Sequence, residues 1–303
     1  MVSNFLSGHD VGIVAYGETR VERRSGRTPY EFAAETFEEI LTKTGMTPAD
    51  IDGFATNVPH SESVNQYYTP YVCDYQGVTP RWMAISDPGG GSAPAAVSRA
   101  ALAIQAGMCE LALVLCADAP SSSWRSGNGG YRPEFWDPTG IQGPPGAFGL
   151  LMNRYAAQYD LKLEALGKLA VAQREGAVLN DNAYEKFRSP ITVRDYLDSR
   201  MISSPVRLLD CVMFADGAAG VLLTSREKAQ KMDAMNIVYP TAYSEIVNFN
   251  GAEAQPDITE TGFSVVGPEV LEKAEMTPED VRMFHPYDDF LIAEMIQLEE
   301  TGW

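Results

Sequence analysis

The segment from Trp82 to Ala119 constrains the fold of this chain more than any other stretch. Its first apolar run, Trp82–Ile85, ends at Asp87-Pro88-Gly89-Gly90-Gly91, which cannot continue a strand because proline lacks a backbone donor and glycine leaves the backbone free. Ser92 then offers an N-cap hydroxyl to a helix with small apolar residues at helical spacing. The run Leu111–Leu115 is almost entirely apolar, as a strand buried on both faces requires. We therefore expect two parallel strands joined by a crossover helix, in the right-handed βαβ arrangement.

The glycine-rich turn within this unit is a candidate place for chemistry. Gly89, Gly90 and Gly91 directly precede the expected helix. Their backbone N–H groups have no side chains to cover them, and the helix dipole adds positive potential at this end. The turn therefore predicts a site that stabilises a developing negative charge, such as an oxyanion or an enolate.

Composition and charge exclude several classes of protein. The chain has 303 residues and a formal net charge of −18, which argues against nucleic-acid binding because phosphate contacts need a basic face. No apolar run approaches the length that spans a membrane, and the first ten residues lack the pattern of a secretory signal, so we expect a cytoplasmic protein. The four cysteines have neither disulfide-framework nor zinc-ligand spacing, so we expect no metal site: Cys73, Cys109, Cys116 and Cys211.

A sequence pattern near the start of the chain recurs near its end. The stretch MTPADIDGF (Met46–Phe54) matches MTPEDVRMF (Met276–Phe284) at Met, Thr, Pro, Asp, an aliphatic position and Phe. Each copy follows a helical pattern and is expected to lead into a strand, which in the second copy covers Val281–Phe284. Helix, capped turn and strand is a common succession, so chance is an alternative to the internal duplication that the matched order favours. No second copy of Trp82–Ala119 precedes Trp303, so we expect the second half to be incomplete or its end not to be recorded.

The stretch between the two copies has two distinctive segments. Ser121–Phe148 is rich in glycine, proline, serine and aromatic residues, which is typical of an ordered functional loop. Cys211–Thr224 is apolar around a small-residue centre and predicts two buried strands. We therefore expect a first half over residues 1–120 and 205–230, a covering domain over 121–204, and a second half over 231–303.

Three segments carry a resemblance to a known family: Trp82–Ala119, RMISSPVRLLDCVMFADGAAGVLLTS (Arg200–Ser225) and HPYDDF (His285–Phe290). Together they resemble the thiolase superfamily. Within the superfamily, the resemblance is to the branch of sterol-carrier-protein thiolases and lipid-transfer-protein aldolases, which cleave steroid side chains.

The resemblance implies a fold and a set of binding partners. The fold is an α/β, five-layered αβαβα architecture of two duplicated halves, in which Ser121–Phe148 belongs to the loop domain over the substrate. The substrates are coenzyme A thioesters, and no covalently bound cofactor is implied. The assembly is a homodimer with a small zinc-ribbon/OB-fold partner protein, which itself carries the zinc.

The sequence departs from thiolases at the nucleophile. By resemblance, the catalytic cysteine of thiolases corresponds to about Gly90, and no cysteine lies between Asp74 and Met108. A glycine there cannot form the acyl-enzyme that thiolytic chemistry requires. The resemblance to the aldolases implies instead a retro-aldol cleavage of a β-hydroxyacyl-CoA, with a steroid or similar side chain. This reaction needs a base, a stabilised enolate and a proton donor.

The motif HPYDDF supplies the remaining candidate residues. The resemblance makes Tyr287 the candidate for proton transfer, with Gly89–Gly91 as the oxyanion donors. A buried tyrosine bonded to backbone is the alternative interpretation of Tyr287. Asp288 is expected to orient nearby groups or to cap a helix over Phe290–Thr301, and His285 is expected on the same strand face as Tyr287.

Two other functions stay open. One is an acetyl-CoA acyltransferase, a true thiolase, with an unconventional nucleophile. The other is a catalytically inactive subunit that binds acyl-CoA or serves as a scaffold. The inactive alternative gains weight because thiolases carry a catalytic His and a second Cys late in their C-terminal half, and neither has a match before Trp303.

Overall fold

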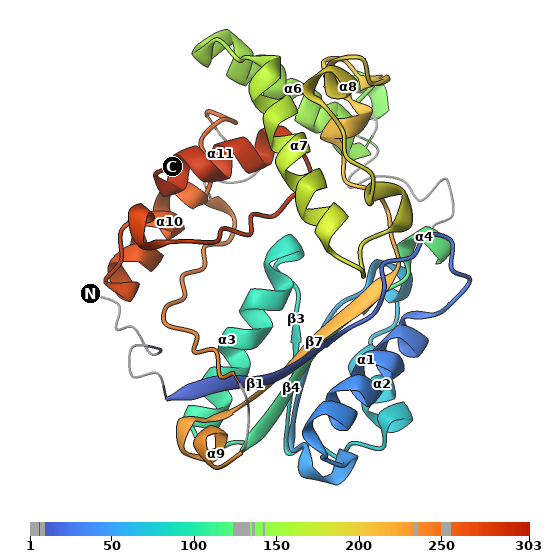
Figure 1. Cartoon of the computed structure of the whole chain (residues 1–303), viewed down its shortest axis with the longest axis vertical. Coiled ribbons are helices and arrows are strands. Elements are labelled where there is room, and N and C mark those ends of the chain that lie inside the picture. The colour runs from blue at the N-terminus through green and yellow to red at the C-terminus, as the bar shows by residue number, and fades with distance from the viewer. Residues whose placement is uncertain are drawn as a thin grey trace. The chain divides into compact units, whose positions relative to one another are not determined.

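The structure is a computed structural model that describes residues 6, 10–123, 134, 137–141, 143–232, 236–249 and 256–303. The chain, coloured in sequence order in Figure 1, forms two compact units. Unit 1 comprises Met1–Trp124, Phe214–Glu245 and Val270–Glu275. Unit 2 comprises Arg125–Met213, Ile246–Glu269 and Met276–Trp303. Within the described ranges, no helix has the length and apolar character needed to cross a membrane.

Unit 1 contains a mixed five-stranded sheet. Its strands are β1 (Val11–Glu18), β2 (Gly53–Asn57), β3 (Trp82–Ser86), β4 (Leu111–Asp118) and β7 (Gly217–Ser225). Their order is β1-β7-β4-β2-β3, with β2 parallel to both β3 and β4, and β7 antiparallel to β1 and β4. The two strands of the expected βαβ unit are therefore parallel, but β2 lies between them.

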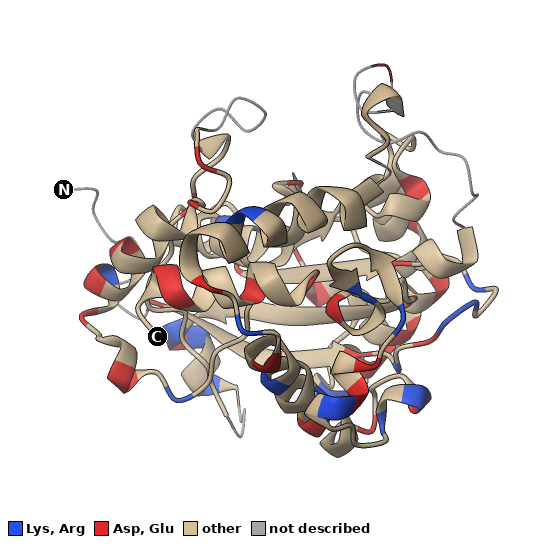
Figure 2. Cartoon of the chain, turned by 90° about the horizontal axis from the view of Figure 1, so that it is seen from above, with Lys and Arg blue, Asp and Glu red and all other residues tan. Residues whose placement is uncertain are grey.

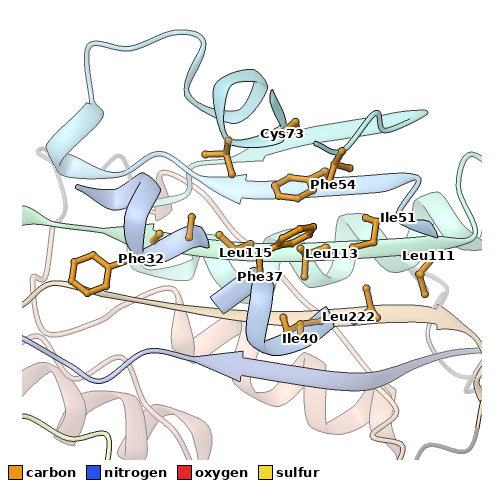
Figure 3. Packing of buried hydrophobic residues seen from close by; sticks show 14 of the residues in the cluster. Phe32, Phe37, Ile40, Ile51, Phe54, Cys73, Leu111, Leu113, Leu115 and Leu222 are labelled. Atoms are coloured by element: carbon orange, nitrogen blue, oxygen red, sulfur yellow. The ribbon is translucent and has the colours of Figure 1, made fainter. Parts of the chain in front are cut away.

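Helices cover both faces of this sheet (Figure 1). Helices α1 (Pro29–Thr44) and α2 (Tyr68–Gln76) pack on one face, and α3 (Ser92–Gln105) packs on the other. Because side chains alternate along a strand, β4 contributes leucines to the first face and shorter side chains to the second. Leu111, Leu113 and Leu115 pack with α1 (Figure 3), and Ala112 and Val114 pack beneath the alanine-rich side of α3.

Helix α1 begins and ends where its sequence predicts. The Thr28 hydroxyl accepts a hydrogen bond from the Glu31 N–H, and the Glu31 carboxylate accepts one from the Thr28 N–H at 2.7 Å. Pro29 occupies the first helical turn, and Gly45 ends the helix with φ at +68°, a left-handed conformation that glycine adopts without strain. These signals are satisfied within a few residues, so they could be read from the sequence.

The prediction of two strands over Cys211–Thr224 is wrong. Only β7 forms there, and Cys211 makes an isolated bridge to Phe290. Before β7, the Asp216 carboxylate accepts hydrogen bonds from Ser25, Ser121 and Ser122 at 2.6–3.2 Å. Loops around a buried carboxylate therefore hold this stretch, where a second strand had been expected. The shorter helices of unit 1 are α4 (Pro120–Ser123) and α9 (Arg226–Lys231).

Unit 2 is mainly helical. It contains α6 (Gly143–Tyr159), α7 (Leu163–Leu179), α8 (Val193–Leu197), α11 (Leu291–Thr301) and residues 263–269 of α10 (Phe263–Ala274), with the short strands β5 (Met201–Ser203) and β6 (Val206–Arg207). Its core joins residues from α6, α7, α8 and α11. Phe148 stacks on Phe290 with ring centroids 4.0 Å apart, which fixes the start of α11. Much of the expected loop Ser121–Phe148 (124–133, 135–136 and 142) lies outside the described residues.

The two copies of the repeated sequence share one local structure and then differ. In both, a threonine and an aspartate form a capping box around a short 3₁₀ turn, Thr47 with Asp50 and Thr277 with Asp280. The first copy leads into β2, but the predicted strand Val281–Phe284 is wrong. A strand must pair its backbone with a neighbour, and in the part of the chain that the structure describes no strand pairs with this segment.

Candidate active site

The glycine turn of unit 1 leads from β3 into α3 as a short 3₁₀ turn, Gly89–Gly91. Gly89 has φ at +66°, and a Cβ placed there would meet no atom within 4 Å. The backbone conformation, rather than crowding, therefore calls for glycine at this position. The three glycines are exposed, so the space over the turn is open to a ligand.

Ser92 does not have the predicted capping role. It is the first residue of α3, the N-cap is Gly91, and no side chain caps this end. The Ser92 hydroxyl instead donates to the carbonyl of Gly89, in the preceding 3₁₀ turn, at 2.6 Å. Ser92 thereby stabilises the glycine turn itself.

The four thiols lie outside this turn. Cys73 and Cys109 are buried, whereas Cys116 and Cys211 are partly exposed. Burial raises the pKa of each thiol to about 11. Since the thiolate is the nucleophilic form of cysteine, none of the four is activated at neutral pH.

A pocket of about 350 Å³ opens at the carboxyl ends of β2 and β4 in unit 1. Its lining includes Cys116 and the carboxylates of Glu18, Asp118 and Asp216, but none of the predicted site residues. Asp118 accepts hydrogen bonds from the backbone of His60 and neighbouring groups. Burial opposes ionisation of Asp216, but its serine hydrogen bonds outweigh burial and lower its pKa. These two carboxylates hold loops together, which gives them a structural role.

Tyr287 lies in the irregular segment before α11 in unit 2. Its N–H donates to Gln297 Oε1 at 2.9 Å, and its carbonyl accepts from Gln297 Nε2 at 2.7 Å. The residue is 52% exposed, and among the described residues the phenol has no hydrogen-bond partner. The alternative interpretation of Tyr287 as a buried structural tyrosine is therefore wrong, because its backbone is anchored while its ring is accessible.

Two of the expectations for His285 and Asp288, a shared strand face and a helix cap, are wrong. His285 does not share a strand face with Tyr287, because no strand forms there. Asp288 does not cap α11, whose N-cap is Phe290 without a side-chain cap. Phe290 has an extended backbone and its ring stacks on Phe148. Its N–H group donates to the Oδ1 atom of the preceding residue, Asp289, at 2.9 Å.

Three groups of this segment and of α11 have raised pKa values. Burial raises the pKa of Asp289 to about 6. Burial, and then the charge of Asp288, raises the pKa of Glu294 to about 7. Burial, followed by Asp289 and Asp288, also raises the pKa of Tyr287. At neutral pH the phenol therefore keeps its proton and can donate a hydrogen bond, and the carboxyl group of Asp289, whose charge acts on the phenol, has a pKa of about 6.

The sequence analysis missed Asp289, Glu294 and Gln297. Glu294 is only 6% exposed and accepts a hydrogen bond from Gln173 at 2.7 Å. The sequence feature that could have identified Glu294 and Gln297 is a polar residue on the apolar side of a helix, since both lie among the buried residues of α11. A buried polar side chain needs a partner, which makes such positions informative.

Comparisons with known proteins agree with this architecture. No family model matches the chain. The chain is 29% identical to the 17-hydroxy-3-oxo-4-pregnene-20-carboxyl-CoA lyase of Mycobacterium tuberculosis, over 98% of the chain and 80% of that protein. It is 26% identical to the steroid side-chain-cleaving aldolase of Thermomonospora curvata, over 96% of the chain and 77% of that protein.

Solved structures share the fold. The Ltp2-ChsH2(DUF35) aldolase matches with a TM-score of 0.79 at 24% identity, over 97% of this chain and 77% of that one. Human mitochondrial 3-ketoacyl-CoA thiolase matches with a TM-score of 0.72 at 14% identity, over 99% of this chain and 84% of that one. The architecture is thus an α/β thiolase-like fold with a mixed five-stranded sheet.

Over nearly its whole length the chain is similar to proteins of the thiolase superfamily, as its sequence motifs predict. Within the superfamily, it is similar to steroid side-chain aldolases and to SCP2-thiolase-like proteins.

Proposed function

We propose that the chain is an enzyme that cleaves a carbon–carbon bond of a β-hydroxyacyl-CoA by a retro-aldol reaction, without a cysteine nucleophile. The observation that carries this proposal is the open glycine turn at the start of α3, in which no thiol lies. The similarity to a CoA lyase and to a side-chain-cleaving aldolase over nearly the whole chain supports the same reaction class.

The proposed reaction needs no covalent intermediate. A base takes the proton of the β-hydroxyl, the Cα–Cβ bond breaks, and a ketone or aldehyde forms from the β-carbon. The electron pair of the broken bond enters the thioester as an enolate. Protonation of the α-carbon then yields the shortened acyl-CoA.

The described residues supply groups suited to each step. Backbone N–H groups of Gly89–Gly91, at the start of α3, are proposed to stabilise the enolate oxygen. Tyr287 is proposed to donate the proton, because its raised pKa keeps the phenol protonated. Asp288 and Asp289 offer carboxylates as proton acceptors beside it, and Asp289, with a pKa near 6, is largely ionised and still weakly basic at neutral pH. His285, in the same segment, is a further candidate for proton transfer.

A second candidate function is acyl transfer. The chain is 25% identical to the acetyl-CoA acetyltransferase of Methanocaldococcus jannaschii, over 97% of the chain and 76% of that protein. This function would require an activated thiol, and the raised thiol pKa values argue against one. A third candidate, an inactive acyl-CoA-binding or scaffold subunit, predicts binding without turnover.

We extend the proposal to assembly. The Ltp2-ChsH2(DUF35) aldolase is by its name a complex of two proteins, and we propose a zinc-ribbon/OB-fold partner for this chain as well. A homodimer, a five-layered architecture from two duplicated halves and a cytoplasmic location complete the proposal. Co-purification of tagged chain with the products of neighbouring genes tests the partner.

The test of function is product analysis with a panel of β-hydroxyacyl-CoA thioesters. The purified chain, alone and with any co-purified partner, should release a ketone or aldehyde and a shortened acyl-CoA. Tyr287→Phe should lower kcat by about 100-fold, because general acid–base groups contribute on this order. The matched control is Tyr159→Phe, since Tyr159 is a similarly exposed tyrosine of unit 2, at 58%.

The outcomes separate the three functions. Formation of two thioesters from a 3-ketoacyl-CoA and free CoA would indicate a thiolase. Binding of CoA thioesters without turnover, with the partner present, would indicate a scaffold. Equal cleavage rates for Tyr287→Phe and Tyr159→Phe would leave the lyase reaction standing but remove Tyr287 from it.

A further inference from the structure

The backbone of Tyr287 forms its hydrogen bonds with a side chain rather than with a neighbouring strand. Residues 281–289 form no regular structure, yet backbone N–H and C=O groups near a protein core need hydrogen bonds. Gln297 of α11 provides two of them, one to the N–H and one to the carbonyl of Tyr287. The amide therefore pairs with both polar groups of a single residue, as a neighbouring strand would.

The direction of the Gln297 amide is determined by these contacts. The Tyr287 N–H requires an acceptor and the Tyr287 carbonyl requires a donor, so a flipped amide would satisfy neither. The second N–H of Nε2 donates to the Ala293 carbonyl at 3.2 Å, one turn earlier in α11. Every hydrogen bond of this amide thus goes either to Tyr287 or to the helix that carries it.

Burial makes this arrangement costly to lose. Gln297 is 3% exposed, and a buried amide without partners is strongly unfavourable. Tyr287, by contrast, is half exposed, and its phenol is unbonded among the described residues. The position of the ring therefore depends on the two hydrogen bonds between Gln297 and the Tyr287 backbone, which we call the Gln297 clamp.

We propose that Gln297 is a positioning residue for Tyr287: its amide fixes the Tyr287 backbone on α11 and so places the phenol for proton transfer. The inference rests on the proposed function and adds to it a residue that never touches the substrate. Misplacement of a catalytic group by about 1 Å can cost about 100-fold in rate. A positioning role therefore predicts an effect on kcat much larger than the effect on KM.

The test compares three variants in the protein with any co-purified partner. Gln297→Leu removes both hydrogen bonds to Tyr287 and should lower kcat by about 10- to 100-fold with KM within about threefold. Gln297→Glu keeps an acceptor for the Tyr287 N–H and should recover part of that loss. Tyr155→Phe is the control, because it removes a partly buried hydrogen bond to Glu299 of α11 without touching Tyr287.

A second readout is independent of turnover. In protein labelled with 3-fluorotyrosine, the Tyr287 resonance is assigned from its absence in Tyr287→Phe. Gln297→Leu should shift and broaden this resonance, and Tyr155→Phe should leave it unchanged. If the unmodified protein cleaves no substrate, the proposed function fails, and the resonance still tests the clamp.

The two proposals fail in different ways. If Tyr287→Phe loses activity while Gln297→Leu matches Tyr155→Phe in kcat, the reaction stands and the positioning role is refuted. An unchanged Tyr287 resonance in a folded Gln297→Leu protein would refute it equally. If Gln297→Leu does not fold, Gln297→Glu is compared with the unmodified protein instead. The same kcat and the same Tyr287 resonance in both proteins would overturn the inference.

Discussion

At the scale of single residues, burial raises the pKa of several groups of this chain. Cys116 lies on β4 and lines the pocket of about 350 Å³, yet its raised pKa keeps the thiol protonated. Tyr287 and Glu294 likewise have raised pKa values. The sequence could show that no cysteine lies in the glycine turn. It could not show these pKa values, because their largest cause is burial, which depends on how the whole chain packs.

Glu294 should make stability depend on pH. Its pKa is about 7 in the folded chain against a usual value of 4.5, so between these values the folded state holds a proton that the unfolded state has lost. Stability from this group is therefore full below pH 4.5 and falls as pH rises toward 7, by about 1 to 3 kcal/mol. Glu294→Gln should remove this loss.

Denaturation with urea at pH 5 and pH 8 measures the effect. The free energy of unfolding should fall more between the two pH values in the unmodified chain than in Glu294→Gln. Asp289 also titrates in this range, but it is present in both proteins and cancels in the comparison. Parallel pH profiles for the two proteins would show that Glu294 is ionised in the folded chain.

At the scale of elements, the sequence predicts what is satisfied locally and fails where a distant partner decides. The capping signals of α1 and the two Thr-Asp boxes, Thr47 with Asp50 and Thr277 with Asp280, are satisfied within three residues and were predictable. The strand expected at Val281–Phe284 has the right residues but no neighbouring strand among those described. The repeated sequence therefore specifies its turn and leaves the next element to the rest of the fold.

The capping box of α1 gives a local test of this view. Thr28→Ala removes the hydroxyl that accepts from Glu31 and should cost about 1 kcal/mol of stability. Thr28→Ser retains a hydroxyl and should cost much less. Thermal or urea unfolding of the two variants measures the difference, and equal losses would mean that the cap does not stabilise α1.

At the scale of the whole molecule, three sequence motifs were enough to predict the family. The charge distribution did not contribute to that prediction. Three segments, Trp82–Ala119, Arg200–Ser225 and His285–Phe290, predicted a thiolase-like chain, and the comparisons confirm it. Acidic residues are spread widely over the chain (Figure 2), in keeping with the net charge of −18. The clamp of Gln297 on Tyr287 could not be predicted, because it joins an irregular segment to a helix through a single side chain.

The central claim is that this chain breaks a carbon–carbon bond without attaching the substrate to sulfur. The most direct measurement is the intact mass of the protein, quenched in acid during turnover of a β-hydroxyacyl-CoA. We predict an unchanged mass while ketone or aldehyde accumulates, and an unchanged kcat for Cys116→Ala. A mass increase equal to one acyl group, located on any of the four cysteines, would contradict the account.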